Sequence, residues 1–287
     1  MGVRMEEYFS PGHTACAGCG MPIVVRHALN ILGKDVIVVN ATSCLEIVSS
    51  AYPRSAWGVP YIHSLFENSA AIAAGAVASL RAQGNNHTKV VVISGDGSTY
   101  DIGFGVLSGM LERNDDVLYI CYDNEAYMNT GNQRSGSTPF GAATTTSPAG
   151  KVRHGKVQWK KPIAEIAAAH KIPYVATASI GYMADFENKV RKAKDMKGAR
   201  FILVLSPCVT GWNYDSAKTI EIAKLAVDTG LWMLYEIENG KLRITYKPQQ
   251  FKPVADYLKM QRRFKHLNEE EIKLIQEHVN RTWAEVK

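Results

Sequence analysis

Four cysteines are the first candidates for chemistry in this sequence. Two residues separate Cys16 from Cys19, a spacing that lets both sulfurs turn toward one centre, and Gly18 permits the tight backbone between them. Cys44 and Cys208 each follow a predicted strand. Because loops at the carboxyl ends of parallel strands converge on one face of a sheet, the four thiolates could meet at one point.

The spacing leaves the bound group open. Zinc sites often pair two Cys-x-x-Cys units, whereas this chain has one such pair and two scattered cysteines, which favours an iron–sulfur cluster over zinc. A redox dithiol would use Cys16 and Cys19 but would leave Cys44 and Cys208 unexplained. Cys121 lies inside an apolar strand pattern and is predicted to be a buried, inert thiol.

A glycine-rich turn is the second candidate site. Gly95, Asp96, Gly97 and Ser98 join the predicted strand Lys89–Ser94 to a helix. Such a turn brings backbone N–H groups and a helix N-terminus close to a phosphate. The Asp96 carboxylate would repel a bare phosphate but suits one carried with Mg²⁺, which prefers oxygen ligands. A dinucleotide fold fits less well, because no Gly-x-Gly-x-x-Gly follows the strand.

An asparagine after the next strand could complete this metal site. Asn124 follows the predicted strand Val117–Tyr122, about one helix and one strand after Asp96. If the two strands are parallel neighbours, both residues lie at the same sheet edge, and the Asn124 carbonyl oxygen can join the Mg²⁺ shell. Gly-Asp-Gly alone could be an ordinary turn. The presence of Asn124 one helix and one strand later favours a magnesium–diphosphate site.

Strand and helix patterns alternate along most of the chain and must position these residues. Five short runs rich in Val, Ile and Leu are typical of buried parallel strands. The alternation predicts a doubly wound, mostly parallel α/β domain over residues 1–250. The predicted strands are Val36–Asn40, Lys89–Ser94, Val117–Tyr122, Tyr174–Thr177 and Phe201–Leu205, and the predicted helices are Met21–Leu32, Ser69–Gln83, Gly103–Arg113, Pro162–His170 and Tyr182–Met196.

Two segments depart from this alternation. Asn124–Lys161 has no clear period and is rich in Gly, Ser and Thr. So long a loop in a compact domain is commonly functional, with a disordered excursion as the alternative. Residues 251–287 are charged and carry a predicted amphipathic helix from Asn268 to Trp283. We expect this C-terminal helical arm to pack on a partner subunit.

Composition and charge argue against several classes of protein. The chain has 287 residues, of which 46% are hydrophobic, so it can bury a sizeable core. Its 33 basic and 27 acidic residues are interspersed, which favours a solvated surface over nucleic-acid binding and leaves an acidic protein partner open. No apolar run reaches the roughly 18 residues that cross a bilayer, and no hydrophobic signal core begins the chain. We expect a cytoplasmic protein with reduced cysteines and no membrane contact.

The motifs together resemble a known family. Asp96 with Asn124 is similar to the thiamine-diphosphate motif, in which Gly-Asp-Gly is followed by Asn. The whole chain resembles the beta subunits of 2-oxoacid:ferredoxin oxidoreductases, pyruvate:ferredoxin oxidoreductase among them. Tyr122–Gly131 is the most specific match. The other matching stretches are Gly12–Gly20, Ser64–Asn68, Gly95–Gly105 and Ser206–Cys208, and together they span nearly all of residues 8–215.

The resemblance implies cofactors that spacing does not give, namely thiamine diphosphate, Mg²⁺ and a [4Fe-4S] cluster. In the family, Mg²⁺ is held at the positions of Asp96, Asn124 and the backbone carbonyl of Ala126. Some relatives have Thr in place of Asn124, which also supplies an oxygen. Cys16, Cys19, Cys44 and Cys208 fall where the cluster ligands fall. The residues expected at the cofactor are Gly95, Asp96, Gly97, Ser98, Asn124, Ala126, Thr42 and Ser43.

The resemblance also implies an activity and partners. Family members oxidatively decarboxylate a 2-oxoacid, here expected to be pyruvate, to acyl-coenzyme A and CO₂, and pass electrons through the cluster to ferredoxin. The expected partners are alpha, gamma and delta type subunits. Asn129 matches a position beside substrate and thiazolium, with a loop-shaping Asx turn as the alternative role. The glutamate that contacts the aminopyrimidine belongs to another subunit or domain, and we find no candidate here.

Other substrates and activities remain as alternatives. Branched-chain 2-oxoacids or oxalate could replace pyruvate, and Tyr127–Gly131 is more similar to the pyruvate and branched-chain members than to the 2-oxoglutarate members. A non-oxidative thiamine-dependent decarboxylase or synthase would need Asp96 and Asn124 but not four cysteines. A zinc-stabilised α/β binding module without catalysis would need no thiamine diphosphate.

Overall fold

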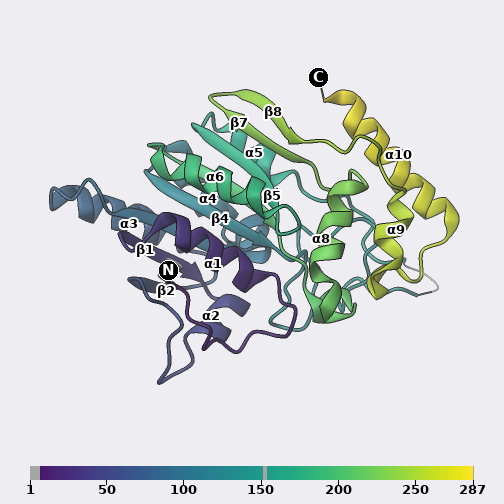
Figure 1. Ribbon diagram of the computed structural model, residues 1–287, viewed down its shortest axis with the longest axis horizontal. Helices are drawn as coiled ribbons and strands as arrows, with labels where there is room; N and C mark the ends of the chain where they lie inside the picture. Colours follow the sequence, from purple (N-terminus) through teal and green to yellow (C-terminus); the bar gives the residue numbers. More distant parts are fainter. Residues whose placement is uncertain (1–6, 151–153, 287) are drawn as a thin grey trace, which may run out of the picture.

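The computed structural model describes residues 7–150 and 154–286 and has an eight-stranded sheet at its centre (Figure 1). The strand order is β2-β1-β3-β4-β6-β5-β7-β8; β1 to β6 are parallel, and β7 joins β5 antiparallel. This confirms the predicted doubly wound, mostly parallel α/β fold. The strands are β1 Val36–Ala41, β2 Tyr61–Ser64, β3 Lys89–Gly95, β4 Val117–Asp123, β5 Tyr174–Ser179, β6 Arg200–Leu205, β7 Leu234–Glu238 and β8 Lys241–Tyr246.

Helices cover both faces of the sheet (Figure 1). In the described ranges, no helix is both long and apolar enough to cross a membrane. A π-helical turn at Gly97–Ile102 leads from β3 into α4, and 3₁₀ turns lie at Ser216–Lys218 and Arg262–Phe264. The α-helices are α1 Met21–Leu32, α2 Cys44–Ser49, α3 Ser69–Ala82, α4 Phe104–Glu112, α5 Ile163–Ala169, α6 Met183–Asp195, α7 Val209–Trp212, α8 Thr219–Asp228, α9 Val254–Lys259 and α10 Glu269–Glu285.

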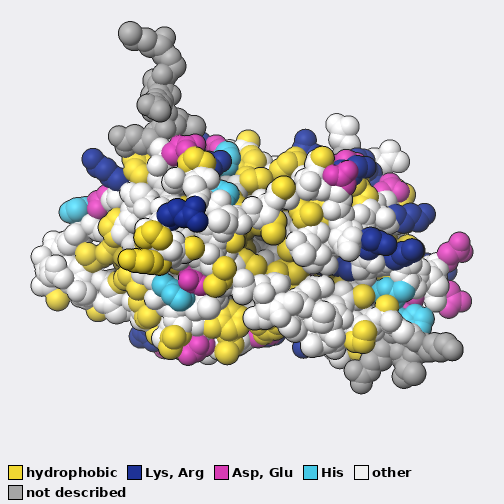
Figure 2. Space-filling view, turned by 90° about the horizontal axis from the view of Figure 1, so that it is seen from below, with side chains coloured by type: hydrophobic (Ala, Val, Ile, Leu, Met, Phe, Trp, Pro, Cys, Tyr) yellow, Lys and Arg dark blue, Asp and Glu magenta, His cyan; other side chains and the backbone are white. Residues whose placement is uncertain are grey.

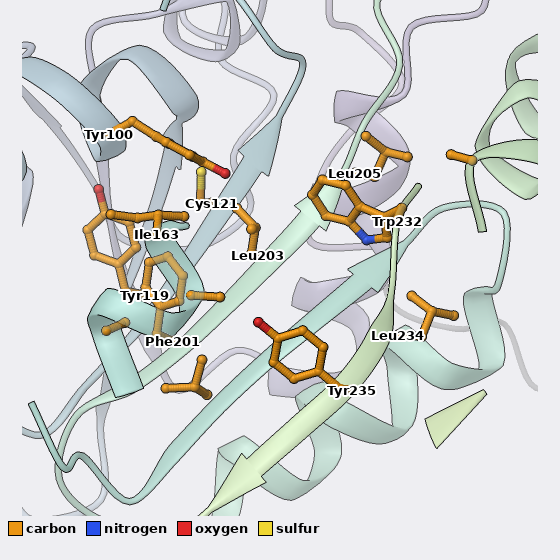
Figure 3. Close-up of a cluster of buried hydrophobic side chains, with 14 of the residues drawn as sticks. Tyr100, Tyr119, Cys121, Ile163, Phe201, Leu203, Leu205, Trp232, Leu234 and Tyr235 are labelled. Carbon is orange, nitrogen blue, oxygen red and sulfur yellow. The ribbon is translucent and has the colours of Figure 1, made fainter. Parts of the chain in front are cut away.

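Each central strand contributes to two cores, because successive side chains point to opposite faces of a sheet. In β4, Tyr119 and Cys121 belong to the core that includes α4 and α5, part of which is drawn in Figure 3. Leu118 and Ile120 belong to the core beneath α1 and α6. Cys121 is fully buried, which confirms its predicted role as a packed thiol.

The predicted elements are all present, and their ends agree with the structure to within two residues. Sequence patterns missed β2, the helices α2, α7, α8 and α9, and the hairpin formed by β7 and β8. The two-residue loop of this hairpin is Asn239–Gly240, with φ of 49° and 79°. Asn-Gly between two apolar runs is the strongest short signal for such a hairpin, so this element was readable.

The C-terminal segment packs on the chain's own domain. Asn268 forms the capping box that starts α10, as its sequence predicted, and α10 buries Ile275 and Val279 in the core of α5 and β7. Trp283 Nε1 donates a hydrogen bond to the Gly230 carbonyl at 2.9 Å. Packing of residues 251–287 on a partner subunit stays a prediction. A partner would contact the side of this segment that faces away from the chain's own core.

Candidate active site

The carboxyl edges of β3 and β4 bring together the residues predicted to bind the metal. The strands are parallel neighbours, and Gly95 lies opposite Tyr122. Asp96 follows β3 directly and Asn124 follows β4 directly, so both lie at this edge. Both side chains are buried, with Asp96 only 1% exposed.

Two spacings between polar atoms at this edge match those that Mg²⁺ would require. One terminal atom of the Asn124 amide lies 2.9 Å from Asp96 Oδ1 and 2.9 Å from the Ala126 carbonyl oxygen. As nitrogen, this atom donates to both oxygens. As oxygen, it completes a trio that suits a cation, because Mg–O distances of 2.0–2.1 Å in an octahedron place adjacent oxygens about 2.9 Å apart. These residues therefore fit Mg²⁺.

The charge of Asp96 supports the same conclusion. Ser135 Oγ donates to Asp96 Oδ2 at 2.6 Å, but in the described ranges no Lys, Arg or His side chain forms an ion pair with this carboxylate. Burial, together with the nearby Asp123 carboxylate, raises the pKa of Asp96 well above its usual value. A bound divalent cation would supply the charge that stabilises the ionised form.

A cavity of about 130 Å³ lies beside this oxygen site. Tyr127 lines this cavity and packs so closely on Gly97 that a Cβ there would lie 2.3 Å from the ring, which explains the glycine. Phe66, from the matched stretch Ser64–Asn68, also lines the cavity. The predicted cofactor residues in its lining are Thr42, Ser43, Gly95, Asp96, Gly97, Asn124 and Ala126, together with the predicted catalytic residue Asn129.

Ser98 is the predicted cofactor-binding residue that lies outside the lining of this cavity. It lies in the π-helical turn Gly97–Ile102 and is buried. Its hydroxyl has no hydrogen-bond partner within the described part of the chain. A contact between Ser98 and a diphosphate stays a prediction.

A second cavity, of about 230 Å³, is lined by all four candidate ligand cysteines. Cys16 and Cys19 precede α1, Cys44 begins α2, and Cys208 follows β6 and caps α7 by accepting a hydrogen bond from Gly211 N at 3.4 Å. The structure thus brings the four cysteines from three loops into the lining of one cavity, and their role as cluster ligands stays a prediction.

The sulfurs surround the cavity instead of gathering on one point. Within residues 7–150 and 154–286, no three His, Cys, Asp or Glu side chains are close enough to bind a single metal ion. A [4Fe-4S] cluster takes four separate thiolates around a multi-atom core, so the donor set fits such a cluster. Burial raises the pKa of Cys19 and of Cys44 to about 12, and it raises the pKa of Cys208 as well. Binding to iron would hold these thiols in the thiolate form.

The two cavities are adjacent and share part of their lining. Cys44, Asn124, Met128 and Asn129 line both. Burial raises the pKa of Cys44, and a hydrogen bond with the Asn129 side chain partly offsets this increase. Asn129 is thus placed between the oxygen site and the cysteines.

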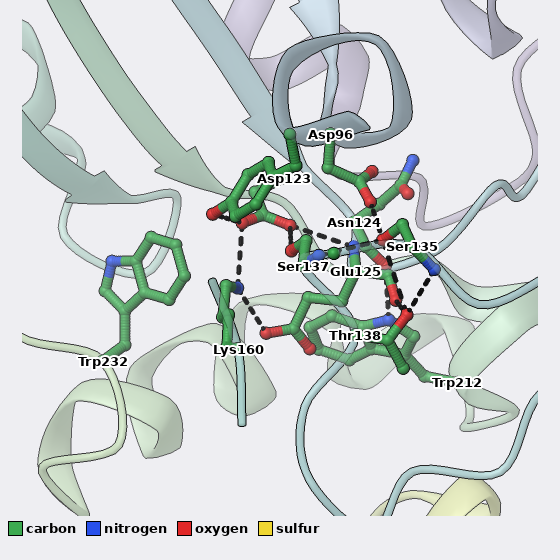
Figure 4. A network of polar contacts seen from close by, with 12 residues as sticks. Asp96, Asp123, Asn124, Glu125, Ser135, Ser137, Thr138, Lys160, Trp212 and Trp232 are labelled. Atoms are coloured by element: carbon green, nitrogen blue, oxygen red, sulfur yellow. Dashed lines mark hydrogen bonds and ion pairs between the residues drawn. The ribbon is translucent and has the colours of Figure 1, made fainter. Parts of the chain in front are cut away.

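A polar network beneath the oxygen site was not predicted from the sequence (Figure 4). Lys160 Nζ lies 2.8 Å from Asp123 Oδ2 and 2.9 Å from Glu125 Oε1. Ser137 Oγ donates to Asp123 Oδ1. Two acidic residues that flank Asn124, Asp123 and Glu125, were a sequence signal for part of this network. Their cationic partner Lys160 could not be predicted, because it lies at the far end of a loop that has no local pattern.

The loop that carries much of the site is packed, although it contains no helix or strand in its described part. Buried Lys156 donates hydrogen bonds to the carbonyls of Ser135, Gly136 and Thr138. The loop also supplies Asn129 to both cavities. This favours the functional interpretation of Asn124–Lys161 over a disordered excursion.

Comparison with known proteins defines the class of protein first. The family model described as "Thiamine pyrophosphate enzyme, C-terminal TPP binding domain" matches residues 41–204, which include Asp96 and Asn124. A solved 2-oxoglutarate:ferredoxin oxidoreductase from Magnetococcus marinus has the same fold, with a TM-score of 0.61 and 19% identity, covering 78% of this chain and 82% of that chain.

Closer relatives then define the family within that class. The chain is 53% identical to pyruvate synthase subunit PorB of Methanothermobacter marburgensis over the full length of both. It is 45% identical to ketoisovalerate oxidoreductase subunit VorB of Pyrococcus abyssi, covering 98% of this chain and 93% of the relative. The chain belongs to this family of thiamine-pyrophosphate-dependent 2-oxoacid oxidoreductase subunits.

Proposed function

We propose that the chain is the thiamine-diphosphate- and iron–sulfur-binding subunit of a pyruvate:ferredoxin oxidoreductase, which converts pyruvate to acetyl-coenzyme A and CO₂. The observation that carries this proposal is the oxygen trio of Asp96, Asn124 and Ala126, in a cavity that shares Cys44 and Asn129 with a four-cysteine cavity. A non-oxidative thiamine enzyme needs the first cavity but not the second. The pyruvate synthase relative supports pyruvate as the substrate.

The chain's own residues would hold the two centres close together. Asp96, Asn124 and the Ala126 carbonyl would bind the Mg²⁺ of the diphosphate, and the four cysteines that line the second cavity would bind a [4Fe-4S] cluster. When bound, thiamine diphosphate supplies a carbon nucleophile and an electron sink for decarboxylation, and the cluster accepts single electrons. The Asn129 amide would orient the 2-oxoacid by a hydrogen bond to its carboxylate or carbonyl oxygen.

A partner subunit would complete this site. In the part of the chain that the structure describes, no glutamate lines the 130 Å³ cavity, so the glutamate for the aminopyrimidine would come from another chain. The cavity is also smaller than the roughly 300–1,000 Å³ that enclose a drug-sized ligand. Ile47, Leu65 and Ile102 are 51%, 63% and 55% exposed. Figure 2 shows hydrophobic side chains across the middle of the lower surface, as expected of a face that another subunit covers.

The electron acceptor and the other substrates follow from the same proposal. We assign ferredoxin as the acceptor, coenzyme A as the acyl acceptor, and alpha, gamma and delta type chains as partner subunits. Reduced thiols are needed for cluster binding, and all five cysteines are free, so we place the reaction in the cytoplasm. A branched-chain 2-oxoacid is the second candidate substrate, because the ketoisovalerate oxidoreductase relative is also similar over nearly the whole chain.

The test is an assay of the intact complex, purified without oxygen, against a panel of 2-oxoacids with and without coenzyme A. We expect reduction of ferredoxin to be fastest with pyruvate and to require coenzyme A. A preference for 2-oxoisovalerate would move the assignment to the branched-chain members. Decarboxylation without reduction of any electron acceptor would contradict an oxidative enzyme.

A further inference from the structure

The two metal ligands proposed on the loop after β4 are separated by one residue with an unusual backbone. Glu125 lies between Asn124 and Ala126 and has φ of 69°, in the left-handed region that residues other than glycine rarely adopt. In this conformation the Asn124 side chain lies 2.9 Å from Asp96 Oδ1 and 2.9 Å from the Ala126 carbonyl oxygen. The geometry of the oxygen site therefore depends on what holds Glu125.

Four contacts hold Glu125 in this conformation, and Figure 4 shows three of them. Its N–H donates to Asp123 Oδ1 at 3.0 Å, and its carbonyl accepts from Thr138 Oγ1 at 2.7 Å. Its carboxylate accepts from Lys160 Nζ at 2.9 Å and from Arg263 Nη2 at 2.6 Å. The first three partners come from β4 and the loop after it, whereas Arg263 comes from the C-terminal segment.

Arg263 also supports the neighbouring ligand by a second route. Trp212 Nε1 donates to the Asn124 carbonyl at 2.8 Å, and the Arg263 guanidinium lies 3.9 Å from the centroid of the Trp212 ring. Arg263 Nε donates to Gln261 Oε1 at 2.9 Å, which leaves this buried side chain little freedom. One arginine thus contacts both groups that orient the turn from Asn124 to Ala126.

We propose that Arg263 is a positioning residue for the magnesium site, acting through Glu125 and Trp212 on the orientation of Asn124 and Ala126. The proposal deepens the proposed function and rests on it, because it assumes that the oxygen site binds Mg²⁺ with thiamine diphosphate. It makes residues 251–287 part of the machinery of the site, in addition to any contact that they make with a partner subunit.

Loss of the Arg263 charge and loss of its positioning role are expected to change the Mg²⁺ affinity in opposite directions. Removing a nearby positive charge, and leaving Glu125 with one cationic partner fewer, raises the electrostatic attraction for a cation. Loss of positioning lowers it, because Asn124 and Ala126 no longer present their oxygens in octahedral geometry. The sign of the change in Mg²⁺ affinity therefore separates the two effects.

The experiment uses the intact complex with Arg263→Met, Arg263→Lys and Trp212→Phe. Binding of thiamine diphosphate is measured by equilibrium dialysis as a function of Mg²⁺ concentration, and Mn²⁺ binding by electron paramagnetic resonance. We expect Mg²⁺ to bind at least tenfold more weakly to Arg263→Met and at least threefold more weakly to Trp212→Phe, which removes one N–H donor without changing charge. Arg263→Lys should recover part of the loss. Mg²⁺ binding that is unchanged or tighter in Arg263→Met, or unchanged in Trp212→Phe, overturns the proposal.

A matched control separates positioning from general destabilisation. Arg200 is 2% exposed and pairs with Asp116 at the opposite end of the sheet. Arg200→Met should lower the melting temperature of the complex, as we also expect of Arg263→Met, but leave Mg²⁺ affinity unchanged. Equal loss of affinity in both variants contradicts the positioning role. If the unmodified complex binds neither Mg²⁺ nor thiamine diphosphate, the proposed function itself fails, and this outcome is distinct from failure of the positioning role.

Discussion

The two halves of the site are held in different ways. The oxygen half rests on side-chain hydrogen bonds and ion pairs, such as those of Ser135 with Asp96 and of Lys160 with Asp123. The cysteine half rests mainly on backbone turns, such as the bond from Cys19 N to the Cys16 carbonyl at 3.0 Å. Gly18 allows that turn with φ of 75°, and a Cβ there would lie 2.4 Å from the Ser216 carbonyl oxygen. Under the proposed function, the oxygen half would therefore be preorganised for Mg²⁺, whereas the geometry of the cysteine half would depend more on a bound cluster.

Burial also has different consequences in the two halves. It raises the pKa of Asp96, one carboxyl group that a single cation can return to the ionised form. It raises the pKa of three cysteines, so cluster binding has to displace several protons. We therefore expect Mg²⁺ affinity at the oxygen half to respond to changes in charge. We expect cluster content at the cysteine half to respond to loss of a ligand and to pH.

The largest expected effect is loss of the cluster on replacement of one ligand. Cys208→Ala removes one of four thiolates and the cap of α7, so the anaerobically purified complex should lack this cluster. Iron and sulfide analysis should fall by four of each per subunit, measured against Cys121→Ala, which alters a buried thiol outside the cavity. Full iron content in Cys208→Ala would show that the cysteine half does not need this sulfur.

Asp96→Asn should weaken Mg²⁺-dependent binding of thiamine diphosphate by roughly 100-fold, because the variant loses the one charged ligand of the oxygen trio. Titration of Mg²⁺ at fixed thiamine diphosphate measures this change. Affinity within a factor of three of the unmodified complex would break the assignment of the oxygen half.

The same substitution should stabilise the cofactor-free complex at neutral pH. A raised pKa in the folded state means that ionised Asp96 disfavours folding once the pH exceeds the ordinary value for Asp, about 3.9. Asn cannot ionise, so the melting temperature of Asp96→Asn should exceed that of the unmodified complex at pH 7. The difference should vanish below pH of about 3.9, where the carboxyl group is protonated in both states.

Cluster insertion into the metal-free complex should accelerate with pH. The pKa values of Cys19 and Cys44 lie at about 12, so the thiolate fraction rises about tenfold per pH unit between pH 7 and 9. We expect the rate of reconstitution with iron and sulfide to rise by up to tenfold per unit, followed by visible absorbance. A flat profile would mean that deprotonation of these thiols does not limit insertion.

Asn129 is one of the four residues that line both cavities. Asn129→Ala removes an amide whose hydrogen bond to a charged substrate group contributes about 1.5–3 kcal/mol, so kcat/KM for the 2-oxoacid should fall roughly 10–100-fold. Thiamine diphosphate and iron contents should stay at their unmodified values, because Asn129 ligates neither centre. Unchanged kcat/KM would favour the Asx-turn role.

Much of the site was readable because its residues occur in short local patterns. The strand that ends in Gly-Asp-Gly and the asparagine one strand later predicted a site at the carboxyl edge of the sheet, and the structure places both there. The spacing of the Cys-x-x-Cys pair predicted two sulfurs directed toward one centre, and both cysteines line one cavity. The resemblance to a known family then supplied Ala126 and Asn129, whose roles no spacing rule contains. The comparisons with relatives confirm that family.

Sequence by itself therefore determined the α/β class, the central strands and helices and the candidate site residues, because these depend on periodicity and on residues near in sequence. Only the tertiary structure decided which distant residues support them. Lys160 and Arg263 reach Glu125 across 35 and 138 positions, and no local pattern encodes such pairs. Burial has the same origin, because the packing of the whole chain around Asp96 and the cysteines raises their pKa values.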